Sequence, residues 1–299
     1  MSAPELVDSP TAMREWSRRA LRAGQRISLV PTMGALHRGH IALVEAATAR
    51  ADVVVVSIFV NPLQFGERGD FDGYPRPIDD DLIACAEAGV DVVYAPTASA
   101  MYPDGFQTRV LPGELARAME GRSRPGHFEG VATVVTKLLA AVRPDLALFG
   151  EKDYQQLAVV RRMAADLDLG VEIVGHPTVR EPDGLALSSR NRRLTATQRR
   201  AARCVPEALR SAIERAADPS ASVDAVLDAA RRAIEAEPAA SIDYVTVFDA
   251  SRLSEVAAFE VERRRAGNYR VAIAARFGDV RLIDNADLFD DTDLLDAGL

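Results

Sequence analysis

Two histidines three residues apart suggest the clearest chemistry in this chain. His37 and His40 belong to the segment PTMGALHRGH, which follows the apolar run 27–30 and precedes residues 41–47, whose composition is helical. A turn from a strand into a helix directs backbone N–H groups and the positive end of the helix dipole toward one point, which suits a phosphate. Gly39 removes a side chain between the two imidazoles, so a phosphate or a nucleobase can approach the backbone.

Two plainer interpretations of the histidine pair compete with phosphate binding. The imidazoles can be ordinary polar groups at a helix start, although two of the chain's four histidines fall in this one motif. A metal site has less support, because neither a cysteine nor a carboxylate lies nearby to complete it. The H-x-G-H spacing resembles the HIGH signature of nucleotidyltransferases and class I aminoacyl-tRNA synthetases, which favours a nucleotide ligand.

A second turn of the same kind follows the apolar run 146–150. There Lys152 can supply a positive charge to a phosphate oxygen, and Asp153 can accept hydrogen bonds from ribose hydroxyls. The alternative is an acidic first helical turn that carries a solvated lysine. Further along, Ser188, Ser189 and Arg190 offer two hydroxyls and a guanidinium that could close over a triphosphate. Alone, this tripeptide is equally typical of a polar turn.

Two amides follow the β-branched run 52–60. Asn61 and Gln64 would lie beyond the carboxyl end of that strand, where open α/β sheets bind ligands. The later run that contains Asp80 and Asp81 has two interpretations: it complements the dipole at a helix start, or it holds a divalent cation.

Strands that alternate with helices predict an α/β fold, a Rossmann-like doubly wound parallel sheet, over residues 1–178. The expected strands are 27–31, 52–60, 90–96, 146–150 and 171–175, with a short one at 108–111, and the expected helices are 9–23 (Thr11 as a cap), 39–50, 79–88, 130–142 and 151–166. Residues 179–299 change character and predict a smaller α+β domain. Its expected helices are about 196–216 and 221–236, and its expected strands are 242–247, 270–277 and 280–284.

The composition is that of a globular protein, with 299 residues, 48% hydrophobic and 27% charged. A formal net charge of −8 argues against a nucleic-acid partner, which basic patches must neutralise. The two cysteines, Cys85 and Cys204, are too few for a disulfide scaffold. Apolar runs are too short to span a membrane, and the first residues lack a basic segment followed by an apolar core, so we expect neither a membrane span nor a secretory signal. We expect a cytoplasmic protein.

Five segments in order closely resemble the pantoate–β-alanine ligase (pantothenate synthetase) family: PTMGALHRGH, VSIFVNPLQFG, RPGHFEGVATVV, FGEKDYQQL and DGLALSSRN. The match is dense over roughly residues 27–200 and looser through DYVTVFDA and ARFGDVRLIDN. The resemblance implies that ATP activates (R)-pantoate as an enzyme-bound pantoyl adenylate, and that β-alanine then displaces AMP to form pantothenate. The alternative is a nucleotidyltransferase of the same HIGH superfamily, which leaves the long second domain and the paired glutamines unexplained.

The resemblance also implies roles for individual residues. His37, His40, Lys152 and Arg190 would be catalytic, and Gln64, Gln156 and Asn61 would bind the substrate. ATP would be held by Met33, Gly34, Ala35, Leu36, His37, Arg38, Gly39, His40, Gly150, Glu151, Lys152, Asp153, Val179, Leu187, Ser188, Ser189 and Arg190. Mg²⁺ is expected because ATP phosphates bind as the metal complex, with Asp80 and Asp81 as candidate ligands. The family resemblance further implies a homodimer and a lid formed by the second domain. Arg124 and His127 lie in one of the matching segments, but their roles do not follow from the sequence.

Overall fold

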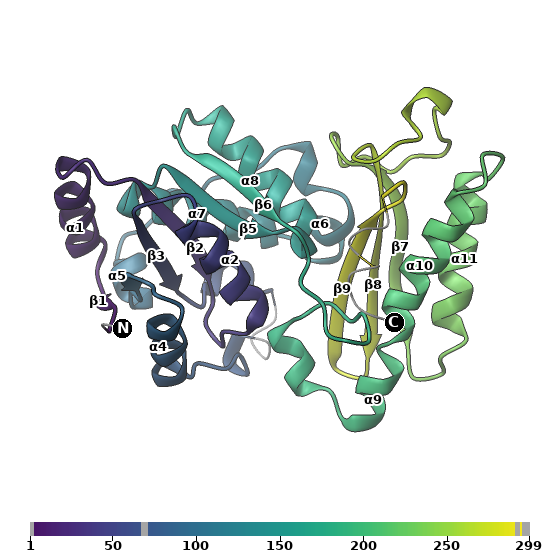
Figure 1. Ribbon diagram of the computed structural model, residues 1–299, viewed down its shortest axis with the longest axis horizontal. Helices are drawn as coiled ribbons and strands as arrows, with labels where there is room; N and C mark the ends of the chain where they lie inside the picture. The colour runs from purple at the N-terminus through teal and green to yellow at the C-terminus, as the bar shows by residue number, and fades with distance from the viewer. Residues whose placement is uncertain (1–2, 67–70, 291–293, 295–299) are drawn as a thin grey trace. The chain divides into compact units, whose positions relative to one another are not determined.

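The structure is a computed structural model that describes residues 3–66, 71–290 and 294 (Figure 1). Contacts between residues divide it into two compact units. Within the described residues, the first unit comprises Met1–Ala116, Glu120–Glu151 and Gln156–His176. The second unit comprises Arg117–Met119, Lys152–Gln155 and Pro177–Leu299.

The first unit is built on a six-stranded parallel sheet in the order β1-β4-β3-β2-β5-β6. In chain order the strands are β1 (Glu5–Val7), β2 (Ile27–Thr32), β3 (Val53–Ile58), β4 (Val92–Tyr94), β5 (Leu146–Gly150) and β6 (Glu172–His176). From β2 the chain builds outward through β3 and β4 in one direction and through β5 and β6 in the other. The carboxyl ends of β2 and β5 therefore flank the point where the strand order reverses, which is where such sheets bind ligands.

Helices cover both faces of this sheet (Figure 1). On one face, α1 (Pro10–Arg22), α7 (His127–Val142) and α8 (Tyr154–Asp166) contribute to a core that includes Leu29 of β2. On the other face, α2 (Arg38–Thr48) and α4 (Ile78–Glu87) contribute to a second core that includes the next residue, Val30. Since both faces of β2 are buried, its sequence is mostly apolar, and its two hydroxyls, of Ser28 and Thr32, are buried and donate to carbonyl groups of β3.

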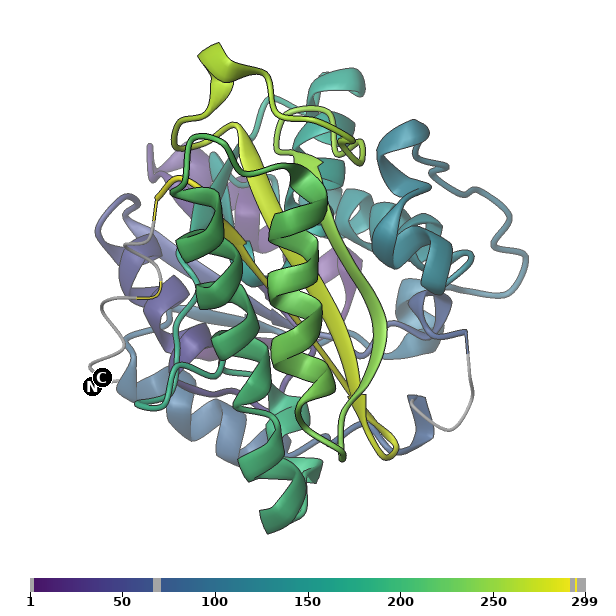
Figure 2. The same cartoon turned by 90° about the vertical axis from the view of Figure 1, so that its right-hand side faces the viewer.

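The second unit contains the antiparallel sheet β7-β8-β9, formed by β7 (Ser241–Asp249), β8 (Tyr269–Phe277) and β9 (Val280–Asp287). Helices α10 (Cys204–Ala216) and α11 (Val223–Glu235) lie side by side across one face of this sheet (Figure 2). Leu209, Val226 and Ile273 are fully buried in the core that they form with the sheet. A shorter helix, α9 (Ala196–Ala201), precedes α10.

Short helical turns connect the main elements: η1 (Pro62–Gln64), α5 (Ala98–Met101), η2 (Glu114–Ala116), α6 (Met119–Ser123), η3 (Glu151–Asp153), η4 (Ser189–Arg193) and η5 (Val261–Arg263). Three of them, η1, η3 and η4, carry residues that the sequence nominates for the site. Over the part of the chain that the structure describes, no helix is long and apolar enough to cross a membrane.

The predicted fold class is confirmed, with several local corrections. Strand β1 lies at an edge of the sheet and was not expected from the sequence, whereas the strand expected at 108–111 is absent. In that segment Val110 donates its N–H to the Thr133 hydroxyl (3.0 Å) instead of to a strand. The cap of α1 is Ser9 and not Thr11, since the Ser9 hydroxyl accepts from Ala12 N.

The helix expected at 196–216 is two helices. Pro206 has no N–H to donate to the carbonyl of Ala202, so the helical hydrogen bonds cannot continue across this point. The chain turns at Ala202–Arg203, and α10 begins at Cys204 with the proline in its first turn.

Candidate active site

The histidine turn, residues 33–40, leaves the carboxyl end of β2 and enters α2. Gly34 and Ala35 are both left-handed, with φ of 80° and 51°. A Cβ at Gly34 would lie 2.8 Å from Oδ2 of Asp81 and 3.1 Å from Cγ2 of Ile58. Glycine is therefore required here both by the backbone angle and by the close approach of a carboxylate.

The two imidazoles cap the start of α2. Nδ1 of His37 accepts from the N–H of Gly39 (3.2 Å), and Nδ1 of His40 accepts from the N–H of His37 (3.3 Å), which is a capping box. The ring centroids are 4.0 Å apart. A ring nitrogen that accepts a hydrogen bond carries no proton, so these bonds assign the proton of each neutral ring to Nε2. The turn thus holds two imidazoles whose Nε2–H groups are donors.

Three backbone N–H groups of the histidine turn are bonded inside the protein. Gly34 donates to the Thr32 hydroxyl (3.1 Å), Ala35 to Oδ2 of Asp81 (2.9 Å) and Leu36 to Oδ1 of Asp81 (2.7 Å). The expectation that the turn presents free backbone N–H groups to a phosphate is wrong for these three residues. A phosphate at this turn would therefore have to be bound by side chains more than by these amides.

The amide of Gln64 meets the histidine turn. Its Nε2 contacts Sδ of Met33 (3.3 Å), and its Oε1 accepts from Nδ2 of Asn61 (3.1 Å). Asn61 also donates to the carbonyl of Gly130 (3.0 Å) and accepts from the hydroxyl of Tyr102 (2.7 Å). Burial raises the pKa of Tyr102 above its ordinary value, which keeps this hydroxyl a donor. The structure therefore brings both predicted amides to the carboxyl end of the first sheet.

Residues from the segment RPGHFEG contact the main chain of Gln64. Nδ1 of His127 lies 2.9 Å from the carbonyl oxygen of Gln64, and Nη2 of Arg124 donates to the same oxygen (3.3 Å). The two side chains also meet each other, with Nη1 of Arg124 3.2 Å from Nε2 of His127. A Cβ at Gly130 would overlap the backbone of Leu63 and would lie 2.6 Å from the N of Gln64. These residues fix η1, a role that the sequence did not indicate.

The second predicted group is divided between the units. Gly150 and Glu151 belong to the first unit, as does the half-buried Gln156 on α8. Lys152 and Asp153 belong to the second, where Nζ of Lys152 is 3.7 Å from the carboxylate of Asp153. The Lys152 side chain is 16% exposed, so most of it is buried.

The third predicted group lies in the second unit. The carbonyl of Val179 accepts from the N–H of Leu187 (2.9 Å), and Ser188 caps η4 by accepting from the N–H of Arg190 (3.2 Å). A buried ion pair between Arg180 and Asp284 (2.6 Å) ties this loop to β9. The segment with Ser188, Ser189 and Arg190 is thus a loop held by these hydrogen bonds and by the ion pair. Arg190 belongs to the helical turn η4.

Comparison with known proteins identifies the family. The model of a family described as pantoate-beta-alanine ligase matches residues 5–287. The chain belongs to this family. It is similar to a pantothenate synthetase of Mycolicibacterium smegmatis, 55% identical over 89% of this chain and 82% of the relative. It is also similar to the crystal structure of a pantothenate synthetase from Thermus thermophilus, with a TM-score of 0.88, 45% identity, and coverage of 96% and 100%.

A second similar structure contains bound ligands. It is a pantoate-beta-alanine ligase from Francisella tularensis complexed with beta-gamma ATP and beta-alanine, with a TM-score of 0.79, 36% identity, and coverage of 96% of this chain and 98% of that one. That relative therefore binds both an ATP-type nucleotide and an amine substrate.

The predicted metal ligands do not fit a resident cation. Both oxygens of Asp81 accept backbone hydrogen bonds, and the residue is 2% exposed. Asp80 is exposed on the surface of α4. Among the described residues there is no group of three or more His, Cys, Asp or Glu side chains that could hold a metal. Mg²⁺ takes six oxygen ligands in an octahedron, and one buried, hydrogen-bonded carboxylate beside one exposed carboxylate does not by itself supply them for a resident ion.

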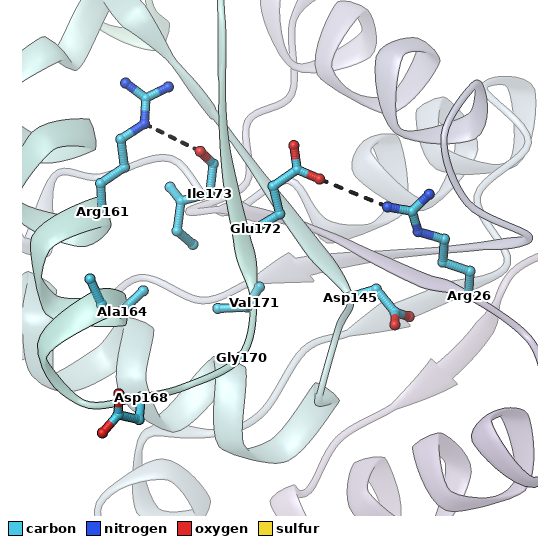
Figure 3. Close-up of a pocket in the computed structure, with 10 residues that line it drawn as sticks. Arg26, Asp145, Arg161, Ala164, Asp168, Gly170, Val171, Glu172 and Ile173 are labelled. Carbon is cyan, nitrogen blue, oxygen red and sulfur yellow. Dashed lines mark hydrogen bonds and ion pairs between the residues drawn. The ribbon is translucent and has the colours of Figure 1, made fainter.

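A hollow of about 740 Å³ lies elsewhere in the first unit (Figure 3). Arg26, Asp145, Arg161 and Glu172 line it, at the end of the sheet where β5 and β6 begin. Several of these charged groups already have partners: Asp145 accepts from the N–H of Ile27 (2.7 Å), Arg161 donates to the carbonyl of Ile173 (3.2 Å), and Glu172 lies 3.8 Å from Arg26. The hollow is at the amino ends of the strands, opposite the histidine turn, and none of its lining residues was predicted for the site.

Proposed function

We propose that this chain condenses (R)-pantoate with β-alanine to pantothenate, using ATP through an enzyme-bound pantoyl adenylate and releasing AMP and pyrophosphate. The observation that carries the proposal is the contact between Met33 and Gln64. It joins the histidine turn, which suits a nucleotide, to the amide that suits a hydroxy acid, at the carboxyl end of β2 and β3. Membership of the ligase family supports the same reaction.

The first half-reaction needs positive character where phosphate charge develops. A carboxylate is a poor acyl donor, so pantoate attacks the α-phosphorus of ATP and pyrophosphate leaves. We assign His37 and His40 as catalytic donors, because their Nδ1 atoms are committed to the backbone and their protons are on Nε2. Such preorganised donors stabilise charge in the transition state without reorganising when the reaction occurs.

Gln64, with Asn61 behind it, and Gln156 are assigned to pantoate. Gln64 is 8% exposed, and its side-chain amide is hydrogen-bonded to Asn61. The orientation of the amide is therefore fixed before the acid binds. A fixed cation there would stabilise the ground-state carboxylate, which does not lower the barrier. The second half-reaction then needs only an uncharged amine group of β-alanine close to the mixed anhydride, where it displaces AMP.

Further residues are assigned to ATP as part of the same proposal. They are Met33 to His40, Gly150 to Asp153, the backbone at Val179, and Leu187 to Arg190, with Lys152 and Arg190 acting on the phosphates. A guanidinium and an ammonium are suited to the phosphate charge. We assign residues 179–299 a lid function, which would exclude water from a hydrolysable anhydride during the reaction.

Three more properties complete the proposal. Mg²⁺ enters as the MgATP complex, held by the phosphates and not by a protein cluster. The chain acts in the cytoplasm, and it acts as a homodimer, which the family resemblance implies. Sedimentation of the purified protein would show a mass of two chains if the dimer is correct, and a single-chain mass at micromolar concentration would exclude it.

Omitting substrates one at a time tests the reaction. The protein is incubated with ATP, Mg²⁺, pantoate and β-alanine, and AMP, pyrophosphate and pantothenate are followed separately. We expect pyrophosphate release to require pantoate, and both multiple-turnover AMP release and pantothenate formation to require β-alanine. Sustained AMP release without the amine, or a stable nucleotidyl product, would favour the nucleotidyltransferase alternative.

A further inference from the structure

The carboxylate of Asp81 occupies the concave side of the histidine turn. Successive left-handed residues at 34 and 35 direct the N–H groups of Ala35 and Leu36 toward one point, a backbone arrangement that binds anions. Oδ2 of Asp81 lies 2.9 Å from one N and Oδ1 lies 2.7 Å from the other. We call this pair of N–H groups, of Ala35 and Leu36, the nest. The anion that the nest binds is therefore a side chain of the protein itself.

This contact joins two elements that are far apart in sequence. Asp81 lies in the first turn of α4, 46 residues from Ala35, and its own N–H donates to the carbonyl of Pro77. The amino end of α4 favours a negative charge. The carboxylate also affects a thiol on the same helix: burial, and to a smaller extent the charge of Asp81, raise the pKa of Cys85 to about 12.

We propose that Asp81 is a positioning residue for the histidine turn rather than a metal ligand. Leu36, one of its two partners, directly precedes His37, the residue that caps α2. Holding residues 35 and 36 therefore fixes where the capping box begins and where both imidazoles lie. The kinetic consequences rest on the proposed ligase function, whereas the hydrogen bonds themselves do not.

The proposal is tested first by Asp81→Asn, with Asp80→Asn as the matched control on the exposed side of the same turn. An asparagine keeps one acceptor but turns an NH₂ group toward a backbone N–H, which loses one bond and sets two donors against each other. We expect pantoate-dependent pyrophosphate release to fall about 10- to 100-fold, the range associated with a displacement of about 1 Å in catalytic groups. Asp80→Asn should keep wild-type turnover.

A magnesium titration separates the two roles of the aspartates. A positioning residue lowers kcat without changing the Mg²⁺ concentration at half-maximal rate in Asp81→Asn. A rise in that concentration of tenfold or more, in either aspartate variant, would show a metal ligand and would overturn the proposal. Unchanged kcat in a folded Asp81→Asn protein would overturn it as well.

Hydrogen exchange provides a test that needs neither a variant nor activity. In the wild-type protein the amides of Ala35 and Leu36 should exchange slowly, as buried donors to a carboxylate do. In Asp81→Asn their exchange should rise at least tenfold while the amides of β2 keep their protection. Fast exchange of both amides in the wild type would refute the contact, even if the Asn variant does not fold. If the wild type lacks ligase activity while both amides are protected, only the proposed function fails.

Discussion

The two nitrogens of His40 have separate functions, and substitution can separate them. Nδ1 accepts from the N–H of His37 and completes the cap of α2, whereas Nε2 carries the proton assigned to catalysis. An asparagine at position 40 places an acceptor near Nδ1 and nothing near Nε2. A glutamine places a donor near the position of Nε2 but provides no acceptor for the cap. Alanine removes both groups.

The expected magnitudes differ for the two functions. Loss of a capping interaction costs about 1 kcal/mol of unfolding free energy. For a chain of this size that is a fall of roughly 2–4 °C in melting temperature. Loss of one preorganised donor to developing charge lowers turnover by roughly 10²–10³. We expect His40→Ala to show both losses, His40→Asn only the loss of turnover, and His40→Gln mainly the loss of stability.

The assay pairs pantoate-dependent pyrophosphate release with thermal unfolding of the same preparations. His40→Gln is expected to turn over faster than His40→Asn, although it is the less stable protein of the two. Near-normal adenylate formation in His40→Ala or His40→Asn would refute the role of Nε2. Equal melting temperatures for His40→Ala and His40→Asn would refute the role of Nδ1 as a cap.

Three further predictions concern other parts of the molecule. Gln64→Ala and Gln156→Ala should weaken pantoate capture and leave ATP binding nearly intact; calorimetry that shows lost ATP affinity in both would contradict their assignment. Arg190→Ala should slow pyrophosphate release far more than it changes ATP affinity, and amine transfer from supplied pantoyl adenylate should suffer little; equal losses in both half-reactions would refute a role on the phosphates. Burial opposes ionisation of Asp249, but hydrogen bonds led by Arg263 outweigh it and hold its pKa well below the usual value. A carboxyl group whose pKa is lower in the folded protein than in the unfolded chain stabilises the fold at pH values above its unfolded pKa. Wild-type stability should therefore fall as the pH drops below about 4, the pKa of an unfolded aspartate. Denaturant unfolding from pH 7 to 3 should show a shallower decline for Asp249→Asn.

Much of the fold could be predicted because the internal strands of the first sheet are buried on both faces. The run 146–150 coincides with β5, and the other internal strands differ from expectation only at their ends. Strand β1 could not be predicted, since it has three residues and only Val7 is buried. Its pairing with β4 is a tertiary contact that no local pattern contains.

The sequence nominates residues for the candidate site, but it does not show the contacts that hold them in place. Motif spacing identified the histidines and Gln64, because their types and positions are local to the sequence. The roles of Asp81, Arg124 and His127 depend on contacts across 45 to 63 residues. Such contacts are set by the packing of α4 and α7 against the sheet. For the same reason, the turn seemed from its sequence to offer N–H groups that the folded protein has already paired.

An internal carboxylate in the histidine turn also bears on catalysis. A nest left open would bind ATP phosphates in the ground state, which tightens substrate binding without accelerating the reaction. With Asp81 in the nest, the turn is held rigid and the donors assigned to the nucleotide are the Nε2–H groups of His37 and His40. Neutral imidazoles bind a phosphate less strongly than a cation does, and they gain most when negative charge increases. The capping box keeps both rings oriented before that charge appears, so the turn is better suited to the transition state of adenylation than to bound ATP.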